Sequence, residues 1–300
     1  MSELRNILIT GGTGFIGGHL CRLLSARGYK ITVLSRNPAQ HTFEGVQFVS
    51  ALDELDVLTD WYGVINLAGE PLSAGRWNAL RKAQYRDSRI ELTQRLNNWI
   101  RGLESPPPVF LSASAVGWYG HWQDESLDES SAANDGYAHQ LCSDWESAAA
   151  EALPPATRVC LIRIGIVLGA DGGPLPEMLL PAKLGLGGPM GSGKQWWSWI
   201  HIHDLICLLL FLLETDSVSG PVNATSPNPV TQREFARSLG VALQRPAFLP
   251  LPGFLAELAL GEFAREILLN GQRVLPVVAQ SAGFPFTYPD LGPALSDILL

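Results

Sequence analysis

Three glycines near the N-terminus, Gly11, Gly14 and Gly17, have the spacing of a phosphate-binding turn. They follow a short apolar run at 7–9, typical of a strand buried on both faces of a parallel sheet, and they open a helical pattern. In such a turn the first glycine permits the bend, the second lets backbone N–H groups approach a pyrophosphate, and the third allows close helix packing. The alternative is a glycine-rich turn that holds no ligand. The residues predicted to contact a dinucleotide are Gly11, Thr13, Gly14, Phe15, Ile16 and Gly17.

The end of the next predicted strand, at 30–35, bears on which dinucleotide would bind. In NAD-specific folds a carboxylate near this point holds the ribose 2′-OH. Here the sequence reads Ser35-Arg36-Asn37, with no Asp or Glu. A guanidinium can pair with a 2′-phosphate and stack on adenine. Ser35 and Arg36 therefore favour NADP (NADPH), and the alternative is a solvated loop arginine.

Alternating strand and helix patterns must position these residues. Apolar strand runs and amphipathic helices alternate through the first half of the chain, which predicts an α/β fold with a Rossmann-type doubly wound parallel sheet. The predicted strands are 30–35, 46–50, 63–69, 109–112 and 158–164, and the predicted helices include 79–100 and 137–152.

The texture of the sequence changes after Gly165. Residues 169–199 are rich in Gly, Pro and Trp, as in lids and substrate-binding segments, and the stretch from Pro246 onward indicates helices separated by turns. We therefore expect a nucleotide-binding domain at 1–165, to which 204–224 returns, and a smaller, mainly helical substrate domain at 166–300. The tryptophans of the loops could line an aromatic pocket: Trp118, Trp122, Trp196, Trp197 and Trp199.

Composition limits the classes of partner. A formal net charge of -8 without a long basic run argues against nucleic acid. The longest apolar run, Leu205–Leu213, is far shorter than the ~20 residues of a membrane span. The four cysteines are scattered, and the first strand leaves no room for a signal peptide. We expect a cytoplasmic protein without membrane partners. His201 and His203 resemble a metal pair, but no third ligand accompanies them, so no metal site is predicted.

Several longer strings resemble the extended short-chain dehydrogenase/reductase superfamily, of the NAD(P)-dependent epimerase/dehydratase type. T-G-G-T-G-F-I-G at 10–17 is similar to its N-terminal fingerprint, and N-L-A-G at 66–69 is similar to its fourth-strand motif. L-S-A-S-A-V-G-W-Y-G at 111–120 resembles its S-S-x-x-V-Y-G segment with one extra residue. A-G-E-P at 68–71 and G-Q-R-V-L-P at 271–276 resemble the atypical branch called epimerase family protein, which has its own C-terminal segment. The resemblance places Leu67, Ala68, Gly69 and Glu70 at the coenzyme.

The resemblance also implies an acid/base pair that is incomplete here. The superfamily uses Tyr-x-x-x-Lys, in which Lys binds the nicotinamide ribose and lowers the pKa of Tyr. This chain has Tyr137 but carries Leu141 at the Lys position. Without a nearby cation a tyrosinate base at neutral pH would cost about 4 kcal/mol. Tyr137 is therefore either a catalytic group or merely part of the first turn of a packed helix.

Other side chains offer partial replacements. Ser114, with Ser112 as its rival, could donate a hydrogen bond to a substrate oxygen. Tyr119 could donate a proton or simply form a wall of the site. Glu70, directly after the fourth strand, could act as a general base or cap a helix.

The resemblance implies an NADP-dependent oxidoreductase or epimerase that acts on a small molecule the sequence does not name. The missing Lys favours an alternative, a non-catalytic NADP-binding sensor or interaction protein. Related enzymes often dimerise through the helices that correspond to 79–100 and 137–151, so a homodimer is also expected from the resemblance.

Overall fold

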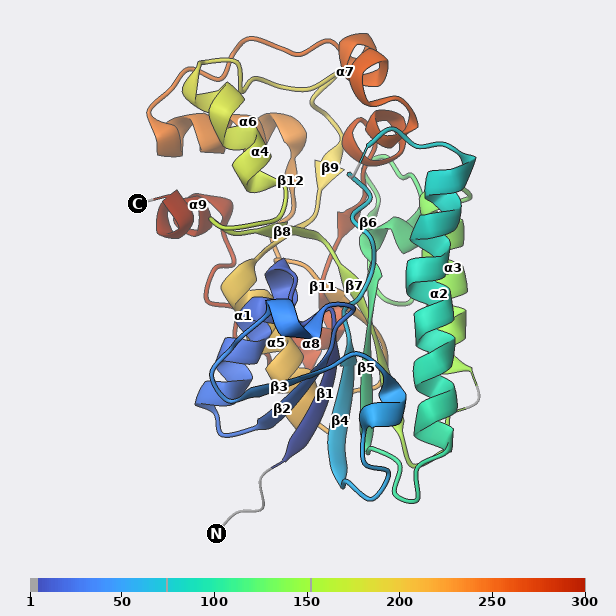
Figure 1. Ribbon diagram of the computed structural model, residues 1–300. Coiled ribbons are helices and arrows are strands. Elements are labelled where there is room, and N and C mark those ends of the chain that lie inside the picture. The colour runs from blue at the N-terminus through green and yellow to red at the C-terminus, as the bar shows by residue number, and fades with distance from the viewer. Residues whose placement is uncertain (1–4, 74, 152, 300) are drawn as a thin grey trace.

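The computed structural model describes residues 5–73, 75–151 and 153–299 and is organised around one seven-stranded sheet (Figure 1). The strand order is β3-β2-β1-β4-β5-β7-β11, and every neighbouring pair is parallel. Its strands are β1 (Asn6–Thr10), β2 (Lys30–Leu34), β3 (Val46–Val49), β4 (Trp61–Asn66), β5 (Val109–Ala115), β7 (Arg158–Ile164) and β11 (Gly220–Ala224).

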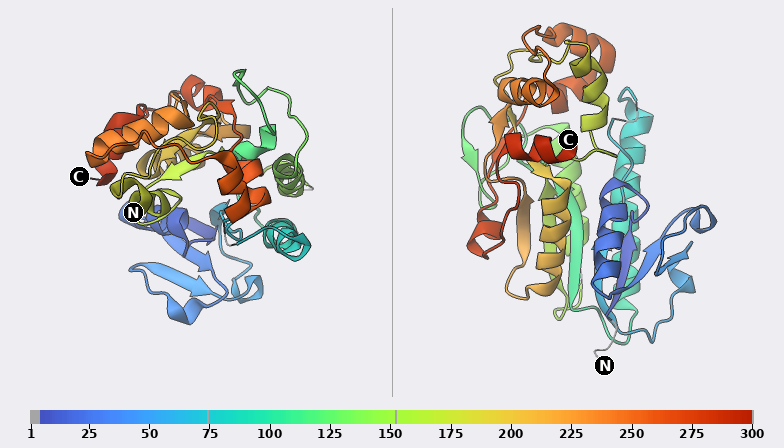
Figure 2. Two further views of the ribbon diagram at one scale, coloured as in Figure 1. Left: turned by 90° about the horizontal axis from the view of Figure 1, so that it is seen from above. Right: turned by 90° about the vertical axis from the view of Figure 1, so that its left-hand side faces the viewer.

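Helices cover both faces of this sheet (Figure 2). On one face α1 (Phe15–Ala26) and α5 (Ile202–Glu214) bury their apolar side chains against β1, β2 and β7. On the other face α2 (Ala79–Arg101) and α3 (Tyr137–Ala150) lie side by side and pack on β4 and β5. Parallel strands with both faces covered need apolar runs, which explains why the strand cores are fully buried. The predicted Rossmann-type fold is confirmed.

The chain reverses its direction across the sheet between β1 and β4. It runs outward from β1 to β2 and β3, then returns to the other side of β1 with β4. Ligands of open parallel sheets bind at such a switch point, beyond the carboxyl ends of the strands. Here these ends are tied together, because Thr10 Oγ1 donates to Asn66 Oδ1 at 2.6 Å and Asn66 Nδ2 donates to Thr93 Oγ1 at 2.8 Å. The switch point is thus a fixed framework.

The C-terminal region forms a separate apolar cluster beyond this edge of the sheet (Figure 1). Its core includes Trp197, Trp199 and Phe235, which are buried and not exposed to a pocket. The helices that build this cluster are α4 (Leu175–Lys183), α6 (Gln232–Leu243) and α9 (Leu291–Leu299), whereas α8 (Val277–Ser281) packs on β11 of the main sheet. A further helix in this part of the chain is α7 (Gly253–Leu260). The short strands outside the main sheet pair two by two. They are β6 (Ser126–Leu127), β8 (Ile166–Leu168), β9 (Trp196–Trp197), β10 (Trp199–His201), β12 (Val230–Thr231) and β13 (Arg273–Val274).

The observed boundaries differ from the predicted ones in a few places. The strand predicted at 63–69 is β4 and ends at Asn66, because residues 67–70 leave the sheet as a loop. The strand predicted to end at Ser112 extends to Ala115. The helix predicted to end at Ala152 ends at Ala150, and Ala152 itself lies outside the described residues.

The second half of the chain contributes both to the main sheet and to the C-terminal region. β11 joins the main sheet beside β7, whereas α6 and α9 pack on each other in the C-terminal region. The division into 1–165 and 166–300 stays a prediction. Within the described residues, no helix is both long and apolar enough to cross a membrane.

Candidate functional site

The glycine turn, residues 11–17, connects β1 to α1 at the switch point. Gly11 has φ +70°, and a Cβ there would lie 2.7 Å from the carbonyl carbon of Leu67. A Cβ on Gly17 would collide with the carbonyl oxygen of Gly11. Both glycines are therefore required by the packing of the turn itself.

Gly14 differs, because a side chain there would make one tight contact and no collision with the described protein. Its backbone is extended, and the only neighbour of an added Cβ would be Gly11 O at 3.3 Å. Gly14 is the N-cap of α1 and is exposed, as is Thr13, and no side chain caps the helix. The N–H groups that open α1 can therefore point to phosphate oxygens. This open, uncapped turn fits the pyrophosphate of a dinucleotide.

Phe15 holds a second segment over the start of α1. Added Cβ atoms at Gly169 and Gly173 would lie 2.6 Å and 3.2 Å from its ring, so these glycines let the chain after β8 pack directly on it. His19 Nε2, one turn further along α1, lies 3.0 Å from an Asp171 carboxylate oxygen. Ile16 packs against the core of the sheet. The first turn of α1 is thus enclosed by residues 169–173 on one side.

Arg36 and Glu70 form an ion pair between the ends of β2 and β4. Arg36 Nη1 donates to Glu70 Oε1 at 2.8 Å, and the side chains are 88% and 33% exposed. The exposed guanidinium can turn to a ligand with little loss of packing. Glu70, however, brings a carboxylate to the end of β2, where the local sequence Ser35-Arg36-Asn37 has none. Neither a helix cap nor a free base describes Glu70 in this structure.

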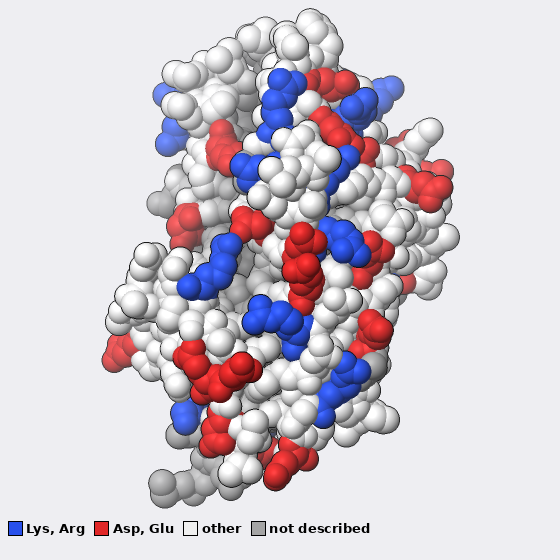
Figure 3. Space-filling model, turned by 45° about the vertical axis from the view of Figure 1, so that its right-hand side comes forward, with Lys and Arg blue, Asp and Glu red and all other residues white. Residues whose placement is uncertain are grey.

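The loop after β4 is fixed through its backbone. The Leu67 and Ala68 N–H groups donate to Thr10 O at 3.1 Å and to Thr10 Oγ1 at 3.3 Å. Gly69 is exposed, and an added Cβ there would lie 2.9 Å from the Arg89 guanidinium carbon. The segment from Leu67 to Glu70 therefore forms a rigid rim beside the glycine turn. Figure 3 shows a hollow on one face of the molecule with side chains of both charge signs around it.

Ser114 lies in a buried polar network. Its hydroxyl donates to Glu146 Oε1 at 2.7 Å, and Arg163 binds both carboxylate oxygens of Glu146 at 2.9 Å. Ser114 is 3% exposed, and its rival Ser112 is fully buried and accepts a hydrogen bond from Asn66 at 3.4 Å. The proton of Ser114 is therefore already used within the protein.

Tyr119 belongs to the same network. Its hydroxyl donates to Asn223 Oδ1 at 2.8 Å and accepts from Arg163 Nη1 at 3.1 Å. The ring is fully buried, and burial raises the pKa of Tyr119 to about 12 despite the nearby Arg163. This placement favours the interpretation as a wall residue. The centre of the Trp118 ring lies 3.4 Å from Cζ of Arg163. Trp118 therefore also packs against this buried network.

Tyr137 remains partly exposed at the start of α3. Its hydroxyl donates to Lys82 O at 3.3 Å, and Lys82 Nζ lies 4.4 Å from the centre of its ring. Burial raises the pKa of Tyr137, while the positive charge of Arg89 opposes that rise. The phenol is therefore neutral at physiological pH. Leu141, at the Lys position, is buried against Trp77 and Tyr85.

Arg89 is a site residue that the sequence did not reveal. Its guanidinium donates to Tyr85 O and Glu70 O, both at 3.0 Å, and lies 5.2 Å from the Trp145 ring centre. Burial lowers the pKa of Arg89, but a guanidinium stays charged in proteins. Arg89 therefore places a fixed positive charge between the Leu67–Glu70 rim and Tyr137. A signal was present: the inward face of α2 carries polar or ionisable side chains every fourth residue, at Tyr85, Arg89, Thr93 and Asn97.

His201 and His203 lie at the start of α5. His201 ends β10 and caps α5, because its Nδ1 accepts the His203 N–H at 3.1 Å. Asp204 accepts the N–H groups of Thr287 and Tyr288 at 3.0 Å and 2.9 Å. Among the described residues no three His, Cys, Asp or Glu side chains are grouped to hold a metal ion.

Comparison with known proteins places two sequence families on this chain. The model of the NAD dependent epimerase/dehydratase family matches residues 7–224, and that of a domain of unknown function, DUF1731, matches residues 251–298. The bovine epimerase family protein SDR39U1 is 40% identical over 300 residues, covering 98% of this chain and 99% of that protein. Epimerase family protein YfhF of Bacillus subtilis is 36% identical over 302 residues, covering 98% of each chain.

A solved structure is similar along nearly the whole chain. The crystal structure of human epimerase family protein SDR39U1 (isoform 2) with NADPH superimposes with a TM-score of 0.89 at 38% identity. It covers 98% of this chain and 99% of that one. The resemblance drawn from the short motifs is confirmed over the full length.

Proposed function

The chain belongs to the NAD dependent epimerase/dehydratase family, and we propose that it binds NADPH and acts as an oxidoreductase or epimerase on a small molecule. The coenzyme supplies hydride transfer. The protein would supply the glycine turn and a fixed cation, Arg89. The human relative that was crystallised with NADPH supports the choice of coenzyme.

The observation that carries the proposal is the contrast within the glycine turn. Gly11 and Gly17 are required by the fold, whereas a Cβ on Gly14 would meet only Gly11 O, at 3.3 Å, and Gly14 is exposed at the uncapped start of α1. A bound pyrophosphate explains why this position carries no Cβ. Thr13, Phe15 and Ile16 complete the first turn at which the phosphates would be held.

The adenosine end of the coenzyme would meet Arg36. On binding, the guanidinium would exchange Glu70 for the 2′-phosphate, a stronger and bidentate partner. Ser35 would lie beside it. Leu67, Ala68 and Gly69 would form the floor on the other side of β1.

At the reacting end, Arg89 would take part of the electrostatic work that a lysine performs elsewhere in the superfamily. It holds the carbonyl of Glu70 and raises the local positive potential near Tyr137. Tyr137, neutral because burial raises its pKa, would donate a hydrogen bond and not act as a base. Ser114 and Tyr119 would shape the site through the Glu146–Arg163 pair.

A non-catalytic coenzyme-binding sensor is the second candidate. The observation that favours it is the use of Leu141 in an apolar cluster with Trp77 and Tyr85, against which Phe263 also packs. This cluster joins the start of α3 to the C-terminal region at the place where an enzyme of the superfamily has its lysine. Coenzyme binding could then be read out as a change in that contact.

A spectrophotometric screen separates the two candidates. Purified protein with NADPH is incubated with a panel of carbonyl compounds, and oxidation is followed at the absorbance of the reduced nicotinamide. Turnover of any compound that is lost in Gly14→Arg would establish the enzyme. Tight NADPH binding without turnover across a broad panel would favour the sensor.

The remaining expectations are proposals as well. All four cysteines are free, and Cys21, Cys142 and Cys160 are buried, which fits a reducing compartment such as the cytoplasm.

A homodimer through α2 and α3 stays a prediction. The exposed face of α2 is mainly polar and charged, so such an interface would depend on ion pairs and hydrogen bonds.

A further inference from the structure

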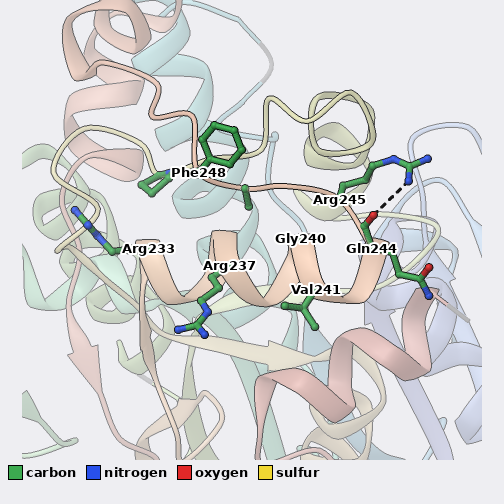
Figure 4. Close-up of a pocket in the computed structure, with 9 residues that line it drawn as sticks. Arg233, Arg237, Gly240, Val241, Gln244, Arg245 and Phe248 are labelled. Atoms are coloured by element: carbon green, nitrogen blue, oxygen red, sulfur yellow. Dashed lines mark hydrogen bonds between the residues drawn. The ribbon is translucent and has the colours of Figure 1, made fainter.

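A groove of about 560 Å³ runs along α6 in the C-terminal region (Figure 4). Its lining includes Arg233, Arg237 and Arg245 together with the apolar side chains of Val241 and Phe248. Arg233 and Arg237 are one helical turn apart, and Arg245 follows the end of the helix. We call this feature the arginine groove.

The charge of the arginine groove is not neutralised by the surrounding protein. None of its described lining residues is a carboxylate, although the chain as a whole carries a formal net charge of -8. Within the described residues Arg237 makes no hydrogen bond or ion pair. Among the same residues the guanidinium of Arg233 donates only to Ser192 O, and that of Arg245 only to the carbonyls of Lys183 and Gln244.

Most donors of these guanidiniums are therefore free. Each guanidinium has five N–H groups in a planar fork that matches carboxylate and phosphate oxygens. The nearest acidic side chain along α6, Glu234, lines a neighbouring groove of about 350 Å³ that Arg237 also borders, and its carboxylate accepts hydrogen bonds from Thr231. The arginine groove thus offers a positive surface to an anion.

Apolar surface adjoins these arginines. Phe248 is 80% exposed and Val241 is 72% exposed, and Pro189 and Ala247 contribute further apolar atoms. Single exposed apolar residues are ordinary, but a pair on the wall of one groove can cover an apolar ligand. A ligand that used both surfaces would be amphipathic.

The walls of the groove are held in place without a ligand. A Cβ on Gly240 would lie 2.7 Å from Ala247 Cβ, so the segment after α6 packs directly on the helix. Leu251 N donates to Pro189 O at 2.8 Å, and Gly191 N donates to Leu251 O at 2.9 Å. Binding would therefore require little ordering of the backbone.

We propose that the arginine groove binds a small amphipathic anion. A phosphate or carboxylate head would pair with Arg237, whose guanidinium has no partner among the described residues, and an apolar body would lie on Val241 and Phe248. The volume of the groove falls in the range of about 300–1,000 Å³ that is usual for small-molecule sites. This site is independent of the coenzyme and of the proposed reaction.

The test is calorimetric titration of the full chain with octyl phosphate below its micellar concentration. Saturating NADPH is present so that the glycine turn does not compete for phosphate. Inorganic phosphate, which has only the anionic head, and octanol, which has only the apolar body and a hydroxyl, serve as comparison ligands. The variants are Arg237→Gln and Phe248→Ser, with Arg95→Gln and Phe254→Ser as matched exposed controls outside the groove.

We expect saturable binding of octyl phosphate, at least about tenfold weaker binding in Arg237→Gln, and unchanged binding in both controls. Phe248→Ser should weaken octyl phosphate more than inorganic phosphate. Thermal melts confirm that each variant is folded. The proposal is overturned by absent binding, by inorganic phosphate binding as tightly as octyl phosphate, or by equal losses in groove and control variants. Association with anionic vesicles alone, without binding of the monomeric probe, also overturns it.

Discussion

Arg36 Nη1 and Glu70 Oε1 lie 2.8 Å apart and so join the ends of β2 and β4 across the end of β1, which lies between them in the sheet. The pair therefore spans the strand that leads into the glycine turn. Arg36 is 88% exposed, and exposed pairs of this kind contribute only about 0–1 kcal/mol. A 2′-phosphate can replace the carboxylate at small cost.

Arg36→Asp should weaken NADPH binding far more than NADH binding. The substitution removes the guanidinium and adds a carboxylate beside Glu70, which repels a 2′-phosphate and leaves a coenzyme with a free 2′-OH largely unaffected. Fluorescence titration with both reduced coenzymes measures the two losses. Equal losses would contradict the assignment of Arg36.

The companion variant Glu70→Gln isolates the competition between Glu70 and the coenzyme. It frees Arg36 and removes a negative charge near the phosphate, so NADPH should bind up to about fivefold more tightly, an effect of at most about 1 kcal/mol. NADH should change less or weaken. A stronger loss of NADPH than of NADH would show that Glu70 supports the 2′-phosphate side in another way.

Gly14→Ala and Gly17→Ala should separate coenzyme binding from folding. Ala at position 14 meets only Gly11 O at 3.3 Å and keeps the extended backbone, so the thermal midpoint should change little while NADPH binding falls at least about tenfold. Ala at position 17 collides with the Gly11 carbonyl, so it should destabilise the fold by a few kcal/mol, about as overpacked cores do. Differential scanning fluorimetry with and without NADPH measures both. A destabilised Gly14→Ala would show that the fold itself, and not a ligand, requires glycine at this position.

Tyr137→Phe should change the turnover of any substrate only modestly, by about tenfold or less. Burial raises the pKa of Tyr137 even with Arg89 nearby, so the phenol is protonated and is not a general base near neutral pH. Steady-state rates across pH 6 to about 9 measure the effect. A loss of several thousandfold would show that Tyr137 is the acid/base group despite Leu141.

Acid should destabilise the fold through His201. The side chain is 3% exposed, and burial lowers its pKa, while Asp297 and Asp204 oppose that shift and His203 adds to it. The unfolded chain then binds the proton more readily, so stability is fully present above the ordinary pKa of about 6.5 and declines as the pH falls below it.

His201→Asn tests this pH dependence because Asn can keep the acceptor that caps α5 but does not titrate. Urea unfolding between about pH 7.5 and 5 measures the free energy of unfolding. In the natural protein it should fall by about 1.4 kcal/mol for each unit by which the pKa of His201 is lower in the folded than in the unfolded state. In the variant the free energy of unfolding should change less with pH. Identical slopes would assign the acid sensitivity to other groups.

The sequence predicted those parts of the site that depend on local geometry. The spacing of Gly11, Gly14 and Gly17 predicted a strand-to-helix turn, which the structure has between β1 and α1, and the binding of the coenzyme there stays a proposal. The parallel sheet followed in the same way from apolar runs of strand length. The end of β4 was placed too late, because L-A-G after Asn66 continues the apolar pattern although its backbone leaves the sheet.

Partners from distant segments could not be predicted in this way. Glu70 reaches Arg36 across 34 positions, and Asn223 accepts from Tyr119 across 104. Sequence spacing does not report such pairs, since the order of the strands in the sheet brings them together. The same holds for Glu146, which accepts the Ser114 hydrogen bond that was expected to go to a substrate. It also holds for Arg89, because the amphipathic pattern of α2 hid the polar stripe to which Arg89 belongs.

We propose that the chain holds NADPH at the glycine turn and recognises its 2′-phosphate through Arg36. The most direct measurement is a fluorescence titration of the purified natural protein with NADPH and NADH in parallel. We expect saturable NADPH binding that is at least about tenfold tighter than NADH binding, a difference of about 1.4 kcal/mol. Equal affinities, or no saturable binding of either coenzyme, would contradict it.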